Sequence, residues 1–241
     1  MKKNGDSQVT GAYEYIRDRI VTYALLPGER LSDYKIAQAL SMSRAPVREA
    51  ILLLERDGLV ALDEKGKKAV AQITLFDVTD ILHVRGALES EALSILSEKG
   101  WLKEEEEKKL KDIHRRMLAA AKNGEVRDCY AYDDAFHHAF VSFAESPRII
   151  ETLERMRLQM QRARFLNATN PVRQEETCKE HEEIIRAILK KDLRGATRAL
   201  RTHFSNSESA FRKALNNQET LTMASMIRSL TAGQVQGPGK R

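Results

Sequence analysis

The sequence predicts a mainly α-helical protein in two parts: a small N-terminal part that combines short helices with a β-hairpin, and a C-terminal bundle of six antiparallel helices. Up to about residue 74, short helical segments precede two apolar stretches, 59–62 and 69–73, which flank a charged turn containing Gly66. That arrangement is typical of a hairpin. After residue 74, every segment carries apolar residues at helical spacing, and glycines and prolines mark the breaks between segments.

These breaks set the predicted helices and domains. The six C-terminal helices are expected at 76–99, 102–122, 125–145, 147–168, 172–190 and 193–217. The predicted divisions of the chain are a flexible N-terminus (1–9), an N-terminal domain (10–74), an all-helical domain (75–220) and a C-terminal tail (221–241), whose last ten residues we expect to be disordered.

The composition excludes several classes of protein. With 241 residues and only two cysteines, the chain cannot be a disulfide framework. Its apolar runs are far shorter than the ~18 residues that a membrane span needs, and no apolar segment follows the N-terminal lysines as in a signal peptide. We therefore expect a soluble, cytoplasmic protein without a membrane partner. The net charge of +5 hints at an anionic partner but does not establish one.

The strongest local pattern lies between residues 33 and 56. A short helix over 33–40 is followed by Ser41-Met42 as a tight turn, and Ser43 is placed to cap a second helix over 44–56. In that second helix Arg44 and Arg48 lie one turn apart on the outer face. This is the pattern of a helix-turn-helix, whose second helix enters the major groove of double-stranded DNA with its N-terminal end.

The hairpin that follows completes a winged helix-turn-helix. Lys67 and its neighbouring lysines lie around Gly66 and are placed to contact the DNA backbone or the minor groove. Arginine contributes sequence specificity because its planar guanidinium can bind two acceptors of guanine at once. The alternative is a solvated charged helix followed by a solvated turn, with no role in binding.

The ordered residues of this region resemble the winged-helix domain of the GntR family of bacterial transcription regulators. The resemblance rests on Pro27-Gly28-Glu29-Arg30-Leu31-Ser32, Ile36-Ala37, Ser43-Arg44-Ala45-Pro46-Val47-Arg48-Glu49-Ala50 and Leu54-Glu55-Arg56-Asp57-Gly58-Leu59-Val60. It implies DNA contacts at Ser43, Arg44, Ala45, Arg48 and Gly66. Two positions depart from the family pattern: Ser41 replaces a common glycine, and Tyr34 replaces a DNA-contacting arginine whose role passes to Lys35 or is absent.

In the C-terminal part, four polar residues occupy positions that the helical pattern turns inward. Asp133 and His137 lie one turn apart on the inner stripe of their helix, and His181 and His203 lie on the inner stripes of the last two helices. A turn near Asp192 is eleven residues from each of these two histidines, so antiparallel neighbours hold both imidazoles at the same depth.

Three imidazoles and one carboxylate inside a bundle predict a divalent-metal site. Zinc is the first candidate, with nickel, manganese or iron as alternatives. A single inward histidine is more often a hydrogen-bonded core residue than a ligand, and that is the alternative for each of the four taken alone.

The same residues resemble the FCD effector domain of the FadR-like branch of the GntR family. The resemblance rests on Asp133-x-x-Phe136-His137, on His181 followed by Ile185, and on His203. Together with the N-terminal motif it covers about residues 10–217, and six helices are similar to the VanR-type subdivision. It implies a metal held by these four residues and a small carboxylate effector bound beside it.

Arg85 is the candidate cation for such an effector. It lies among apolar residues on the inner stripe of the first C-terminal helix. Because an unpaired buried guanidinium is costly, it must contact either a protein carboxylate such as Glu89 or a bound acid.

These patterns predict a homodimeric DNA-binding regulator rather than an enzyme. We expect the regulator to act as a repressor. Each protomer would read one half of a palindromic operator, and a small organic acid would change the arrangement of the two reading helices. Two alternatives remain: a metal sensor, in which the ion itself is the signal, and a metal-dependent hydrolase. The hydrolase leaves the N-terminal motif unexplained and has no separate general base on the same face.

Overall fold

The structure is a computed structural model that describes residues 2–166 and 171–216. The chain divides into two compact units, one built from the residues up to Thr74 and the other from Leu75–Leu215. The tail predicted at 221–241 lies outside the described residues. Within them the protein is mainly helical, which confirms the predicted fold class.

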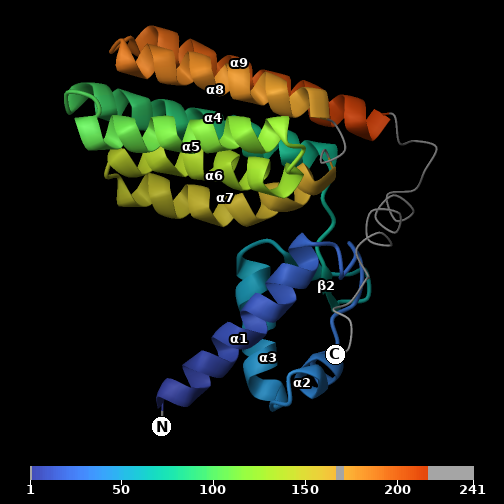
Figure 1. Ribbon diagram of the computed structural model, residues 1–241. Helices are drawn as coiled ribbons and strands as arrows, with labels where there is room; N and C mark the ends of the chain where they lie inside the picture. Colours follow the sequence, from blue (N-terminus) through green and yellow to red (C-terminus); the bar gives the residue numbers. More distant parts are fainter. Residues whose placement is uncertain (1, 167–170, 217–241) are drawn as a thin grey trace, which may run out of the picture. The chain divides into compact units, whose positions relative to one another are not determined.

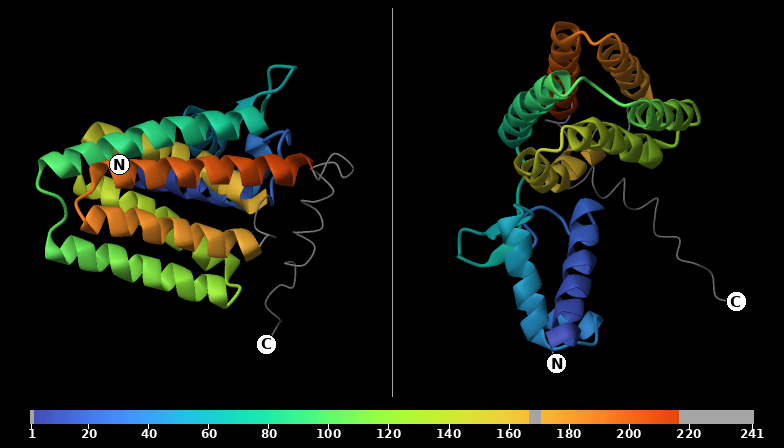
Figure 2. Two further views of the ribbon diagram at one scale, coloured as in Figure 1. Left: turned by 90° about the horizontal axis from the view of Figure 1, so that it is seen from above. Right: turned by 90° about the vertical axis from the view of Figure 1, so that its left-hand side faces the viewer.

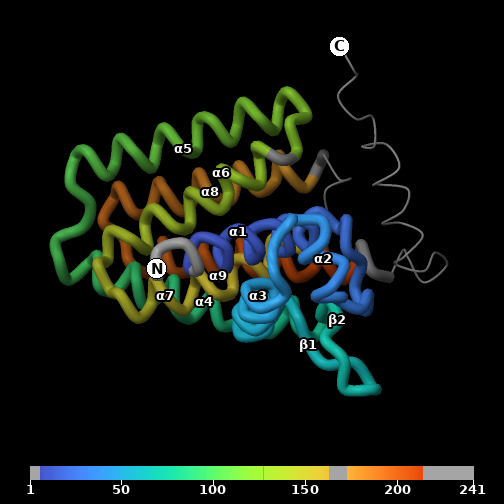
Figure 3. The backbone as a smooth tube through the Cα atoms, turned by 90° about the horizontal axis from the view of Figure 1, so that it is seen from below, coloured from blue at the N-terminus to red at the C-terminus, as the bar shows by residue number. Residues whose placement is uncertain are grey.

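The N-terminal unit contains three helices and a two-stranded antiparallel sheet (Figures 1 and 3). The elements are α1 (Lys2–Val21), α2 (Asp33–Ala39), α3 (Arg44–Arg56), β1 (Val60–Leu62) and β2 (Lys68–Val70). Their apolar faces share one core, to which α1 contributes Ile16 and Ile20 and α3 contributes Val47 and Leu54, all fully buried. This core fixes the outward direction of the opposite face of α3.

α1 begins at Lys2, so residues 2–9, which the sequence led us to expect as a flexible N-terminus, are helical in the structure. Asp6, Ser7 and Gln8 are exposed, and Ala12 is the first buried residue among the described side chains of this helix. Periodicity did not reveal this helical segment because residues 2–9 contain a single apolar residue, Val9, and so carry no apolar stripe.

The turn between α2 and α3 is unusual at Ser41. This residue has φ 52°, in the left-handed region that glycine adopts most easily. The structure thus gives a physical reason for the glycine that is common at this position in the family pattern. Ser43 stands at the N-cap of α3 as predicted, but its side chain makes no capping hydrogen bond.

The hairpin pairs Val60 with Val70 and Leu62 with Lys68, which confirms the predicted wing. Its turn is organised by Asp63. One oxygen, Oδ1, accepts hydrogen bonds from the backbone N–H groups of Lys65 and Lys67, at 2.9 and 2.8 Å. Gly66 has φ 71° at the tip, where the turn needs a residue without a Cβ.

The C-terminal unit is a bundle of six helices that run antiparallel to one another along the chain (Figures 1 and 2). They are α4 (Leu75–Glu98), α5 (Glu104–Lys122), α6 (Val126–Phe143), α7 (Pro147–Leu166), α8 (Pro171–Leu189) and α9 (Leu193–Asn216). Each lies within two residues of its predicted bounds, because Gly100 and Gly124 adopt positive φ after helices and the two prolines begin helices.

The helices of this bundle bury an apolar core around a polar centre. Phe136 and Phe140 of α6 are fully buried, as are Ile184 of α8 and Leu200 of α9. Charged and imidazole side chains lie among them, which is where the candidate site forms. None of the described helices is both long enough and apolar enough to cross a membrane.

Candidate metal centre and DNA-reading surface

The predicted DNA-contacting residues are exposed on the N-terminal unit. Five of them lie on α2 and at the start of α3, and two lie at the tip of the hairpin. They are Lys35, Ser43, Arg44, Ala45, Arg48, Gly66 and Lys67. Tyr34, which replaces a DNA-contacting arginine of the family pattern, is 61% exposed beside them. The N-terminal end of α3 is therefore accessible to a partner.

Sequence reasoning missed the carboxylate that holds the two arginines. Asp33, the first residue of α2, accepts two hydrogen bonds from Arg44 Nη2, at 2.9 and 3.0 Å, and one from Arg48 Nε at 2.5 Å. The hydrogen bond from Arg48 is the largest of the effects that lower the pKa of Asp33 below its ordinary value. Both guanidinium groups are thus paired within the protein.

The four predicted metal ligands come together inside the C-terminal unit. Asp133 and His137 come from α6, His181 from α8 and His203 from α9. All four are buried, and one ligand atom from each lies within 4.8 Å of the others. The turn between α8 and α9 at Asp192 sets His181 and His203 at the same depth, with ring centroids 4.8 Å apart.

The donor atoms of this cluster suit a cation. Nε2 of His137 lies 3.2 Å from Nε2 of His203, while Nδ1 of each ring faces a carboxylate. When Nδ1 donates, a neutral ring has a lone pair on Nε2, so two lone pairs face each other unless a cation lies between them. His181 is fully buried; its Nδ1 has no hydrogen-bond partner, and its Nε2 lies 3.2 Å from Asp133 Oδ1 without meeting hydrogen-bond geometry. Buried nitrogens of this kind fit a metal ion.

Two glutamates orient the outer side of the cluster. Glu89 Oε2 accepts from His137 Nδ1 at 2.6 Å, and Glu180 Oε2 accepts from His203 Nδ1 at 2.8 Å. Carboxylate–histidine pairs of this kind fix the ring and raise the basicity of metal-binding imidazoles. Burial opposes ionisation of both glutamates, but the histidine and the arginine that each one contacts lower its pKa to about 2. They therefore remain ionised acceptors.

Burial also opposes the charged form of two of the imidazoles. It lowers the pKa of His181 to about 3 and also lowers the pKa of His203. Taking an imidazolium out of water is unfavourable, so both rings stay neutral at physiological pH. Neutral imidazole is the form that binds metal ions.

Arg85 is buried as predicted, and its partner is Glu89, the protein carboxylate that we considered as an alternative to a bound acid. Its Nε and Nη2 donate to Glu89 Oε1 at 3.1 and 2.9 Å. A second arginine mirrors it: Arg173 of α8 donates from Nη1 and Nη2 to the two oxygens of Glu180, at 2.6 and 2.8 Å. Each outer side of the cluster is therefore an arginine–glutamate–histidine chain.

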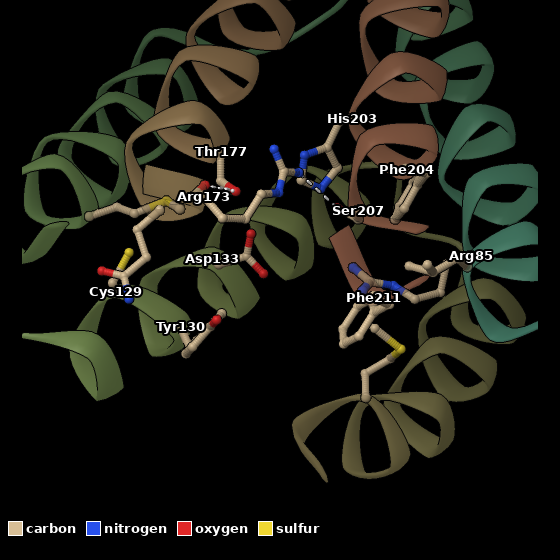
Figure 4. Close-up of a pocket in the computed structure, with 14 residues that line it drawn as sticks. Arg85, Cys129, Tyr130, Asp133, Arg173, Thr177, His203, Phe204, Ser207 and Phe211 are labelled. Atoms are coloured by element: carbon tan, nitrogen blue, oxygen red, sulfur yellow. Dashed lines mark hydrogen bonds between the residues drawn. The ribbon is translucent and has the colours of Figure 1, made fainter. Parts of the chain in front are cut away.

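A cavity opens beside the cluster. Asp133 and His203 line it together with both Arg85 and Arg173. Figure 4 shows Asp133, Arg173 and His203 pointing toward one another, while Arg85 enters from the α4 side near Phe211. The candidate ligand cluster therefore has an open side within reach of a small molecule.

Several residues of the site were not predicted, for identifiable reasons. Glu180 precedes His181 and lies beside the apolar stripe, so its contact with His203 depends on how α8 packs against α9. Arg173 lies seven residues before Glu180, two turns away along the same face, which is a spacing that can signal such a pair. Asp33 has no periodic relation to Arg44, eleven residues later.

An exposed helix-turn-helix with a wing, together with a helical unit that contains a buried ligand cluster, defines a DNA-binding transcription regulator. Residues 8–66 match the family described as bacterial regulatory proteins, gntR family, and residues 80–206, more than half of the chain, match the FCD domain. The chain belongs to the FCD-containing branch of the GntR family, and it is a regulator rather than an enzyme.

Similar sequences are named as regulators. The uncharacterized HTH-type transcriptional regulator YdhC of Bacillus subtilis is 28% identical over 80% of this chain and 86% of its own length. The HTH-type transcriptional repressor RspR of Escherichia coli is 24% identical over 83% of this chain and 87% of its own.

Solved structures share the fold. Escherichia coli McbR/YncC is 21% identical, with a TM-score of 0.71 over 86% of this chain and 97% of its own. A GntR-type regulator from Rhodococcus sp. RHA1 is 23% identical, with a TM-score of 0.72 over 86% of this chain and 99% of its own.

Proposed function

We propose that this regulator is a homodimeric repressor controlled by a small carboxylate that binds beside a divalent metal in the C-terminal domain. The observation that carries the proposal is the buried cluster of Asp133, His137, His181 and His203, which opens onto a cavity that is also lined by Arg85. The proposed DNA-reading domain is 10–74, and the proposed effector domain is 75–220.

On the DNA side, the proposal assigns base reading to the N-terminal end of α3. Arg44 and Arg48 reach base edges, while Lys35, Ser43, Ala45 and the wing residues Gly66 and Lys67 contact bases or phosphates. Two winged helices related by a two-fold axis then read the two halves of a palindrome about one DNA turn apart, which requires a dimer. The name of the relative RspR supports repression as the outcome.

On the effector side, the four clustered residues would hold the ion, with Glu89 and Glu180 fixing the orientation of two of the imidazoles. A bound divalent ion supplies positive charge and free coordination positions for an acid. Zinc fits a donor set of three imidazoles and one carboxylate, and nickel, manganese and iron are the alternatives to test. Arg85 lines the same cavity and is placed to donate to the acid.

An effector regulates DNA binding only through a difference in its affinity for the DNA-competent and DNA-incompetent arrangements of the dimer. The proposal therefore predicts that carboxylate and DNA compete, each weakening the binding of the other by the same factor. This reciprocity distinguishes an effector from a ligand that merely stabilises the fold.

One experiment tests the DNA and effector sides together. The operator is first selected from random duplex DNA with the purified full chain, whose metal content and mass in solution are measured. Operator binding is then titrated with and without chelator and with a panel of small carboxylates. The proposal expects a dimer that retains metal and releases DNA only when an acid is present; an Arg44→Ala chain that keeps its sequence preference contradicts it.

The same titration separates the proposal from a metal sensor. In a sensor, metal alone switches DNA affinity, and acids have no effect at constant metal. In the proposed regulator, metal persists through purification and acid provides the signal.

A further inference from the structure

We infer that Gln174 recognises an uncharged oxygen of the effector, so that the effector is a small hydroxy- or oxo-carboxylate rather than a plain carboxylate or a dicarboxylate. The inference rests on the proposed function of the cavity beside the cluster. It adds the chemical class of the acid and the residue that selects it.

Gln174 of α8 is only 3% exposed and lines the cavity. Its Nε2 is a buried donor with no hydrogen-bond partner. Among the described residues that line this cavity, Gln174 has the one buried side-chain nitrogen without a hydrogen-bond partner. A buried donor without an acceptor is costly, so an acceptor that the protein does not supply must come from a bound ligand or a water.

The guanidinium groups of the cavity differ from this amide because they already contact carboxylates. Arg85 bonds Glu89, and Arg173 bonds both oxygens of Glu180. The charge of each arginine is thus matched within the protein. A second carboxylate near Gln174 would be buried beside a neutral amide, which is unfavourable for an ion but not for a hydroxyl or a carbonyl.

Other uncharged polar groups lie at the same level of the bundle. Thr177 is one turn before His181 on α8, and Ser207 is one turn after His203 on α9. Because α8 and α9 are antiparallel, both hydroxyls lie on the same side of the cluster, toward Gln174. Both line the cavity, and Figure 4 shows them on either side of Arg173.

The size of the cavity limits the acid. Its volume is about 50 Å³. One water needs roughly 10–15 Å³ measured in this way, so the space suits a molecule of few heavy atoms. The acid series that tests the inference therefore starts at three carbons.

The test compares propanoate with 2-hydroxypropanoate, 3-hydroxypropanoate, 2-oxopropanoate and malonate, by calorimetric titration of the zinc-loaded full chain. We expect at least one acid with a hydroxyl or oxo group to bind roughly 3- to 10-fold more tightly than propanoate, the range of one hydrogen bond to a buried partner. We expect malonate to bind more weakly than that acid.

Two variants assign the gain to Gln174. Gln174→Leu keeps the size of the side chain and removes the amide, so it should bind propanoate as the wild type does and lose the preference for the oxygenated acid. Gln161→Leu is the matched control, because Gln161 of α7 bonds Asp134 and does not line this cavity. It should keep the preference.

The ligand-free proteins give a second, independent readout. Replacing an unsatisfied buried amide by an apolar group of similar shape is neutral or stabilising, so ligand-free Gln174→Leu should melt at or above the wild-type temperature. A large drop in melting temperature would show that the amide is satisfied without ligand and would overturn the inference.

The remaining outcomes are distinct. Equal binding of propanoate and all oxygenated acids, or tightest binding of malonate, overturns the inference and leaves the proposed carboxylate effector standing. A preference that survives in Gln174→Leu overturns the role of Gln174. No binding by any acid of the series overturns the inference, and the operator titration with the wider panel of carboxylates then decides whether the proposed carboxylate effector stands.

Discussion

Asp33 accepts two hydrogen bonds from Arg44 Nη2, at 2.9 and 3.0 Å. The same carboxylate also bonds Arg48, so the two arginines proposed to read DNA share one internal anion. About half of the Arg44 side chain and 61% of the Arg48 side chain are exposed, and Asp33 is 21% exposed. DNA phosphates and base acceptors must therefore compete with a neighbouring carboxylate for these guanidinium groups.

This competition predicts the effect of Asp33→Asn. Removing the charge frees both guanidinium groups, so affinity for a random-sequence duplex should rise roughly three- to sixfold at low salt, the effect of one or two exposed ion pairs. Discrimination between operator and random DNA should fall, because free arginines bind phosphates of any sequence. Fluorescence anisotropy with both duplexes at two salt concentrations measures the change.

Asp112→Asn is the matched control for this variant. Asp112 of α5 also bonds two arginines, Arg115 and Arg116, but lies in the other unit. It should leave DNA affinity unchanged. Unaltered affinity for random DNA in Asp33→Asn would show that the ion pair does not restrain the arginines.

Replacing an outer glutamate should lower the affinity for metal even though all four proposed metal ligands remain. In Glu89→Gln, the carboxylate that accepts from His137 Nδ1 at 2.6 Å becomes an amide. Such a change weakens metal binding by about 10- to 100-fold. Competition with a chromogenic chelator, read on zinc-loaded protein, gives the ratio.

His138→Ala tests whether that loss is specific. His138 neighbours His137 on α6, but its ring is about half exposed and faces Glu154. This variant should bind zinc as the wild type does. A Glu89→Gln protein with wild-type zinc affinity would remove Glu89 from the proposed site.

The sequence predicts most of the fold because its signals are local. Gly100 and Gly124 end helices and Pro147 and Pro171 begin them, so the helix bounds follow from single residues. The pairing of His181 with His203 is equally predictable, because two antiparallel helices joined by a short turn place residues equidistant from that turn side by side.

The contacts around the cluster could not be predicted in this way. Whether Glu180 reaches His203 depends on the rotation and separation of α8 and α9, which no periodicity encodes. The burial of Arg85 was predictable, but the choice between Glu89 and a ligand as its partner depends on side-chain rotamers. The same limit hid Asp33 and Gln174, whose importance comes from contacts made or lacking in the folded chain.

A hydrogen bond in the N-terminal unit predicts a pH dependence of stability. Tyr13 of α1 donates to Asp57 Oδ2 at 2.7 Å, and burial together with this carboxylate raises the pKa of Tyr13 to about 12 from 10. Because the folded pKa is the higher one, the contribution is complete below pH 10 and is lost as the pH rises from 10 to 12.

Tyr13→Phe isolates this contribution. The free energy of unfolding of the wild type should fall by about 1 kcal/mol more than that of the variant between pH 9 and 12, a value reduced for the partial exposure of Tyr13. Urea unfolding at a series of pH values measures both. Parallel profiles for the two proteins would show that the tyrosine ionises as freely in the folded protein as in the unfolded chain.

The left-handed conformation of Ser41 predicts a stabilising substitution. At φ 52° a serine is strained and a glycine is not, so Ser41→Gly should raise the free energy of unfolding by about 0.5–1 kcal/mol despite the greater freedom of glycine in the unfolded chain. Ser43→Gly is the control, because Ser43 has φ −72° and makes no capping hydrogen bond, so the same substitution gains nothing there. Thermal unfolding of the two variants compares them directly. If Ser41→Gly melts no higher than Ser43→Gly, the turn between α2 and α3 stores no strain at Ser41, and the glycine common at this position would need another explanation.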